Sequence, residues 1–222
     1  MPTGDDGAQR QLRVGVALES RRPKLAGIYR AAHAALASPA VAGGEVARVA
    51  VVCHCMRELV NGLPSALKTP TLTRARGKQS SESLKLKLPK LLSKHPVDLR
   101  QDQDLIPVPR EIAGVVADII NAVEQEGSRN LINAAVLVTG GSDTNHPLLK
   151  QWREAEEFFF EWTHLDRNDD NSRALPTDAE ILAHIEVVEA VIEVQTTLFF
   201  ANLHAVQDLL DEANSQDDGG SQ

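Results

Sequence analysis

A row of four polar side chains interrupts a helix that is otherwise apolar. The row consists of His54, Arg57, Glu58 and Asn61, and the spacing i, i+3, i+4 and i+7 places all four on one face of an α-helix. The imidazole and the guanidinium could face a cleft and hold an anionic ligand or a phosphodiester. If the row is buried, it could instead form a hydrogen-bonded network between helices, because each unpaired buried polar atom costs about 1–3 kcal/mol. Both interpretations stay open.

A ribonuclease site is a second possibility, and it would use Arg48 together with His54. Ribonucleases of the HEPN class, helical proteins common in bacterial toxin and defence systems, are known by an Arg separated from a His by four to six residues; here five intervene. Chance alone produces such a pair in a chain with this many Arg and His residues. The pair also lies early in the chain, whereas the class usually carries it near the end of its bundle. The spacing supplies an alternative hypothesis and no family assignment.

A metal site is a third possibility, with Glu157, Glu161 and His164 as candidate ligands. Glu161 and His164 form a Glu-x-x-His pair, which is the spacing that carboxylate-bridged di-iron bundles use. Such a centre needs a second pair, and the chain has none. Because charged helix faces are usually solvated, we expect no metal and no other cofactor. A single-metal site could still be completed from a facing helix by Glu186, Glu189 and Glu193.

Two further features suit structural roles better than chemical ones. Cys53 and Cys55 lie too close together in a helix for an ordinary disulfide or a complete zinc site, so we expect reduced thiols. The sequence TGGSD at 139–143 lacks the Lys of a nucleotide-binding loop and indicates the end of a helix. No serine lies in the context of a nucleophile elbow. We therefore expect no catalytic machinery of these kinds.

Large aromatic side chains are concentrated in the last third of the chain. The pattern Phe-Phe-x-x-x-His occurs there twice, at 159–164 and 199–204. Because aromatic rings bury the greatest apolar area per residue, we expect the best-packed part of the core in this region. The repeated pattern is better explained by two aromatic helices packed antiparallel than by paired metal ligands. A hairpin symmetric about residues 166–176 would place Trp162 near Glu180, and Trp152 near Ala190.

Hydrophobic periodicity predicts an all-α fold, a helical bundle of about six or seven helices. Apolar residues at 3-4 spacing, with Pro near the starts and Gly near the ends, predict helices over 23–37, 45–63, 109–126 and 148–165. A capping box of Thr177 and Glu180 opens a long C-terminal helix of some 35 residues, which is about 52 Å in length.

Three segments are ambiguous. Residues 13–18 could form a strand or a helical turn. Residues 84–92 alternate like a strand, but a short helix is favoured because a single strand would have no partner. Residues 131–139 predict a short buried helix that ends at Gly140, with a strand over 134–139 as the alternative.

Charge is distributed unevenly along the chain. Residues 68–94 carry eight bases against the single acid Glu82, whereas residues 150–222 carry four bases and seventeen acids. The basic segment is therefore expected to dock on an acidic surface of this chain, of a second copy or of a partner protein. Nucleic acid is possible but not favoured, because the segment has no aromatic side chains to stack on bases and the net charge of the chain is −8.

The composition predicts one helical domain over residues 12–213, in which 68–108 form a loop-rich basic excursion. Hydrophobic residues make up 42% of the chain, which suffices for a core. Residues 1–11 and the acidic tail at 214–222 have too little apolar surface to offset ordering entropy and are expected to be disordered. The apolar runs are too short to span a membrane and the N-terminus is unlike a secretory signal, so we expect a cytoplasmic protein.

These observations favour an intracellular interaction or regulatory protein over a metabolic enzyme. The expected partner is another protein or a second copy of the chain, with no membrane association. The composition, rich in Ala, Val and Arg, is typical of bacterial proteins. The alternatives are the helical ribonuclease or toxin-like effector and the metal-binding bundle. Candidate catalytic residues are Arg48, His54, Arg57 and Glu58.

Overall fold

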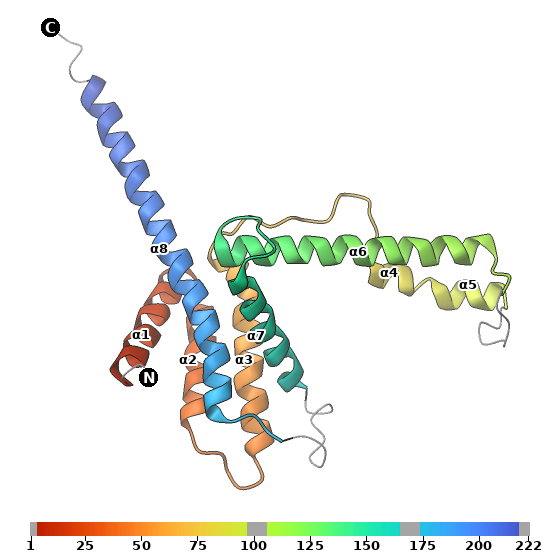
Figure 1. Cartoon of the computed structure of the whole chain (residues 1–222), viewed down its shortest axis with the longest axis horizontal. Coiled ribbons are helices and arrows are strands. Elements are labelled where there is room, and N and C mark those ends of the chain that lie inside the picture. The colour runs from red at the N-terminus through yellow and green to blue at the C-terminus, as the bar shows by residue number, and fades with distance from the viewer. Residues whose placement is uncertain (1–3, 97–105, 165–173, 218–222) are drawn as a thin grey trace. The chain divides into compact units, whose positions relative to one another are not determined.

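Every regular element in the described part of the chain is a helix. The computed structural model describes residues 4–96, 106–164 and 174–217, with side chains for 6–96, 106–164 and 174–197. The all-α prediction is confirmed. In chain order the helices are α1 (Gly4–Arg21), α2 (Pro23–Ala37), α3 (Glu45–Ala66), α4 (Ser81–Lys85), α5 (Leu88–Lys94), α6 (Arg110–Thr139), α7 (Pro147–Thr163) and α8 (Asp178–Asp217) (Figure 1).

The helices belong to two compact units. One unit contains residues 1–70 and 135–222, and the other contains residues 71–134. The first unit holds the main core. The second consists of the basic segment packed on the N-terminal part of α6. The basic excursion and its helix therefore make enough contacts with each other to form a unit of their own.

The core of the first unit is built around α3, which packs against α2 on one side and α7 on the other. Helix α8 packs against α1 and α7. The largest side chains that are fully buried include two rings of the aromatic helix, as the concentration of aromatics predicts. The largest fully buried side chains described in this unit are Leu18, Tyr29, Met56, Leu59, Leu63, Leu149, Trp152, Phe159, Ile181, Ile185 and Ile192.

Two helix ends lie farther out than expected. Helix α1 begins at Gly4, although residues 1–11 were expected to be disordered, and this result also decides segment 13–18 in favour of helix. Val14 and Leu18 anchor α1 with no exposed surface, and a helix fixed at one end propagates at little cost. Helix α8 continues to Asp217, beyond the expected boundary at residue 214. Residues 218–222 lie outside the described part of the chain.

Three residues expected to stop helices lie inside them. Helix α3 includes Gly62 and Pro64 and ends at Ala66, followed by Lys68 with a φ of 53°. Helix α6 passes through Gly127 and ends at Thr139, so the two helices expected over 109–126 and 131–139 are one. Gly140 does stop α6, with a φ of 74° that a glycine adopts without strain.

The segments around α4, α5, α7 and α8 agree closely with the predictions made from the sequence. Within 84–92 the residues are helical in α4 and α5, with a turn at 86–87 between them. The capping box of α8 forms as predicted, because the Thr177 backbone N–H donates to Glu180 Oε2 at 2.7 Å and the Glu180 N–H donates to Thr177 Oγ1 at 3.2 Å. Phe158 and His184 stack with ring centroids 4.1 Å apart. That contact has the same register as the expected hairpin, whereas the side chains of the second aromatic pair, at 199 and 200, lie outside the described residues.

Within the described residues, no helix combines the length and apolar character that a bilayer span requires.

Candidate functional site

Arg48 connects three helices of the first unit. Its guanidinium donates to the Leu36 carbonyl oxygen at the end of α2, at 2.8 Å, and forms an ion pair with Asp178 in the first turn of α8. His54 lies six residues farther along α3 and is exposed. A six-residue step turns a helix by about 600°, so the two side chains leave α3 in different directions. The structure does not bring Arg48 and His54 together.

The polar row on α3 is mostly solvent-exposed. His54, Glu58 and Asn61 are exposed, and Arg57 is half-buried. The Arg57 guanidinium lies over the ring of Phe160 in α7, with its central carbon 5.1 Å from the ring centroid. This cation–π contact fixes the guanidinium on the neighbouring helix. Exposure of the other three side chains removes the need for an interhelical network.

Arg57 lines a pocket of about 340 Å³ between α3 and α7. The pocket carries two guanidinium groups and two carboxylates, and burial raises the pKa of Glu156 above its ordinary value. The two guanidinium groups have two carboxyl groups beside them, so the pocket has no excess of basic side chains to attract an anion. The lining residues are Arg57, Val60, Asn61, Arg153, Glu156, Glu157, Phe159 and Phe160.

The candidate metal ligands are not gathered into one cluster with the carboxylates of α8. Glu157 is exposed, and His164 follows α7 with its ring 5.2 Å from that of Phe160. Glu193 of α8 instead pairs with α1, through Arg10 at 3.3 Å and Arg13 at 2.8 Å. Among the described residues no group of three or more His, Cys, Asp and Glu side chains could hold a metal ion.

A buried carboxylate with two partners is the most unusual group in the first unit. Glu189 of α8 is only 4% exposed. It accepts a hydrogen bond of 2.6 Å from the Tyr29 hydroxyl and lies 3.1 Å from His33 Nε2, both on α2. Burial, together with the hydrogen bond and the charge of Glu189, raises the pKa of Tyr29 far above its ordinary value. This cluster, which we call the Glu189 cluster, holds α2 and α8 together.

The Glu189 cluster was missed by sequence reasoning, although one signal could have indicated part of it. Glu189 follows Ile185 and precedes Ile192 at the 3-4 spacing of a buried stripe, so an acid at that position needs partners. Nothing in the spacing indicates Tyr29 and His33, which lie 160 and 156 residues away. Cys53 is also buried, and burial raises the pKa of its thiol to about 12, as suits an unreactive thiol.

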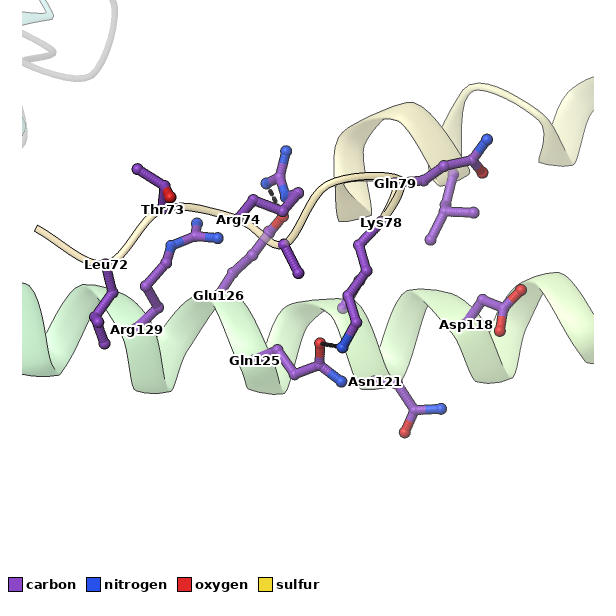
Figure 2. Close-up of a pocket in the computed structure, with 13 residues that line it drawn as sticks. Leu72, Thr73, Arg74, Lys78, Gln79, Asp118, Asn121, Gln125, Glu126 and Arg129 are labelled. Carbon is purple, nitrogen blue, oxygen red and sulfur yellow. Dashed lines mark hydrogen bonds and ion pairs between the residues drawn. The ribbon is translucent and has the colours of Figure 1, made fainter.

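The second unit contains a pocket of about 590 Å³ between residues 71–80, which we call the strap, and α6 (Figure 2). Arg74 of the strap pairs with Glu126, and Lys78 donates to Gln125 Oε1 at 2.9 Å. Asn133 fastens the start of the strap, because its side-chain oxygen accepts from the Leu72 N–H at 2.6 Å. Arg74 and Lys78 thus attach the strap to α6.

Further contacts join the basic segment to α6. Glu126 also accepts from the Ser81 hydroxyl at 2.6 Å, which fastens the start of α4 to α6. Glu111 accepts from Lys94 at 3.2 Å and lies 3.3 Å from His95 Nε2. Apart from Glu82, which pairs with Lys85 inside the segment, the acidic partners described for the basic segment in this unit belong to α6.

One face of α6 in the second unit is apolar and uncovered. Val116 is 40% exposed, Ile120 55% and Val123 48%, whereas Ile112, one turn before Val116, is 2% exposed. Two small residues extend the exposed row. We call this row the α6 stripe; it consists of Ala113, Val116, Ala117, Ile120 and Val123.

Comparisons with protein-family models, with curated proteins and with solved structures found no match.

Proposed function

We propose that this chain is a helical interaction or regulatory protein without catalytic machinery and that the α6 stripe is its binding surface. The observation that carries this proposal is the exposure of Val116, Ile120 and Val123 on one helix face. Single exposed apolar residues are common on any protein surface. A row of them on one element is a mark of an interaction site.

The spacing of the stripe specifies the kind of partner that it fits. Ala113, Val116, Ile120 and Val123 follow one another at steps of three, four and three residues. This is the spacing with which one helix packs along another in a coiled-coil contact. The partner that suits such a row is an amphipathic helix.

The polar groups of the first unit support a structural interpretation of that unit. Arg48 is used to join α3 to α2 and α8. The buried carboxylate of Glu189 is shared between Tyr29 and His33. Groups that could have served catalysis are thus engaged in holding helices together, which favours an interaction role over the ribonuclease and metal-binding alternatives.

Site-specific photo-crosslinking tests the proposal. A photoreactive amino acid replaces Ile120 in the full-length protein, and the control places it at Leu86, which is 70% exposed in the same unit but outside the stripe. Irradiation in cells should give one discrete adduct at position 120 and none at position 86. Equal labelling at both positions, or no adduct at position 120, would contradict a binding role for the stripe.

A further inference from the structure

The geometry of the α6 stripe points to a second copy of this chain as its occupant, with the two α6 helices packed antiparallel. This inference rests on the proposed function, since it names the partner of the same surface. It commits to one register, in which Val116 of one copy packs against Ile120 of the other. Two independent features support it, the apolar layers and the flanking charges.

The apolar layers select the register. With Val116 opposite Ile120 of the second copy, the remaining two positions also match, because Ala113 then lies opposite Val123 of that copy. All four residues of the 3-4 row pair with one another. A shift by seven residues would instead place Gly127 and Asn130 against the stripe, which would bury an amide and leave a gap.

The flanking charges favour the same register. Arg110 and Glu124 both lie next to the stripe, fourteen residues apart, and both are exposed. In the antiparallel register given by the apolar layers, Arg110 of one copy lies beside Glu124 of the other. Two-fold symmetry repeats this pair at the other end of the contact. Opposite charges at flanking positions are the usual determinant of helix orientation in such contacts.

A parallel arrangement does not use these charges. It would place Arg110 level with Arg110 of the second copy, and Glu124 level with Glu124, but on opposite sides of the contact. Glu124 would then face Ile119 of the second copy, so the pair of opposite charges would not form. The charges therefore distinguish antiparallel from parallel packing, which the apolar row alone does not.

The contact covers residues 110–124, about 22 Å of helix at 1.5 Å per residue. Four layers with two alanines bury less surface than stable dimer interfaces do. We therefore expect a reversible dimer whose population rises with protein concentration and falls with added salt.

Charge reversal tests the pairing. In sedimentation equilibrium, Arg110→Glu and Glu124→Arg should each weaken dimerisation about tenfold or more, because each places like charges at both ends of the contact. The double variant Arg110→Glu/Glu124→Arg should restore the parental dissociation constant. The matched control is Asp118→Arg, which makes the same change of charge on α6 outside the stripe and should leave dimerisation unchanged. A double variant that is as weak as the single variants would overturn the pairing.

Cysteine pairing tests the register. A mixture of Val116→Cys and Ile120→Cys proteins should form a disulfide between different variants on mild oxidation. Each variant alone should crosslink much less, because position 116 faces position 120 and not itself. Equal crosslinking of the mixture and of the single variants would overturn this register.

The two proposals fail in different ways. If the photo-crosslinker at position 120 gives an adduct with another protein while the parent sediments as a monomer at every concentration, the second copy is wrong and the interaction role survives. If no adduct forms and the parent is monomeric, both proposals are wrong. An adduct with twice the mass of the chain, together with rescue by the double charge reversal, supports both.

Discussion

At the scale of single residues, the Glu189 cluster joins α2 to α8 through a buried carboxylate. A carboxylate that is 4% exposed has lost nearly all of its hydration, which is costly unless partners replace the water. The hydroxyl of Tyr29 and the imidazole of His33 supply two such contacts from α2. The ring of Tyr29 also meets that of His33 edge-on, with centroids 4.7 Å apart. The three side chains therefore form one connected cluster.

Tyr29→Phe tests this arrangement. The variant keeps the buried ring and removes the hydroxyl, so Glu189 loses its 2.6 Å hydrogen bond. We expect the free energy of unfolding to fall by about 1.5–3 kcal/mol, the range for a hydrogen bond to a charged group. Urea denaturation followed by circular dichroism measures the change.

A double-mutant cycle separates the hydrogen bond from other effects of Tyr29→Phe. In a Glu189→Leu background the hydroxyl has no carboxylate to bind, so the same substitution should cost less there. If Tyr29→Phe costs as much in that background as in the parent, the hydroxyl stabilises the fold through something other than this carboxylate.

His184 gives a prediction about pH. Its ring stacks on Phe158, and burial lowers its pKa below the ordinary value of 6.5, although the charges of Glu154 and Glu180 act in the opposite direction. A lowered pKa in the folded state means that the neutral imidazole is favoured by folding. The stability that the neutral imidazole provides is complete above pH 6.5 and is lost as the pH falls through the folded-state pKa.

We expect His184→Phe to preserve the stack while removing this titration. The free energy of unfolding of the variant should decline less than that of the parent between about pH 7 and pH 5. Thermal unfolding at a series of pH values measures both curves. His184→Leu, which also loses the ring, should be less stable than His184→Phe at every pH but share its slope. Parallel curves for the parent and His184→Phe would show that folding does not lower the pKa of His184.

At the scale of elements, the sequence predicts helices well where apolar spacing and local capping agree. Helix α2 begins at Pro23 and ends at Ala37 as expected, and the capping box locates the start of α8. Helix ends marked by Gly alone are less certain. Gly140 ends α6 because it adopts a positive φ, whereas Gly127 is helical. The residue type permits both conformations, so the pattern cannot choose between them.

The helical conformation of Gly127 predicts the effect of Gly127→Ala. A Cβ added at Gly127 would meet no atom within 4 Å, and the residue lies in the interior of α6. Alanine should therefore stabilise the helix by about 0.5–1 kcal/mol, because it restricts the unfolded chain more than glycine does. Hydrogen exchange of the backbone amides around residue 127 measures the local effect.

The control for this substitution is Gly140→Ala, where the φ of 74° is unfavourable for a side chain. That variant should be less stable than the parent. A loss of protection in Gly127→Ala would mean that α6 needs a flexible point at residue 127.

The candidate sites could be predicted only in part, for a physical reason. Local spacing correctly places side chains on one face of one helix, as for the α3 row and the apolar side of α6. It contains no information on which helices meet, so it could not show that Arg48 binds Asp178 or that Glu189 binds Tyr29. It also could not show which part of the wide apolar face of α6 the basic segment covers. The exposed stripe is what remains after that packing.

At the scale of the whole molecule, different interactions stabilise the two units. The first unit buries large apolar side chains such as Trp152 and Phe159, so it depends on the hydrophobic effect. The second has Ile112 and Leu84 as its buried large apolar side chains among those described and depends more on polar contacts at Glu126 and Glu111. Because polar contacts at a surface contribute little free energy, the second unit should open more readily than the first.

Trypsin measures this difference, since it cleaves after Arg and Lys. Glu126→Ala removes the acceptor for Arg74 and for Ser81, so the strap should detach and cleavage after Arg74 should become about tenfold faster. Asp118→Ala removes an acid from the same pocket without removing either contact, and its cleavage rate should equal that of the parent. Cleavage after Arg57 in α3 should stay slow in both variants, because the first unit keeps its core. If cleavage after Arg57 accelerates together with cleavage after Arg74, the two units open as one and the division into independently stable parts is wrong.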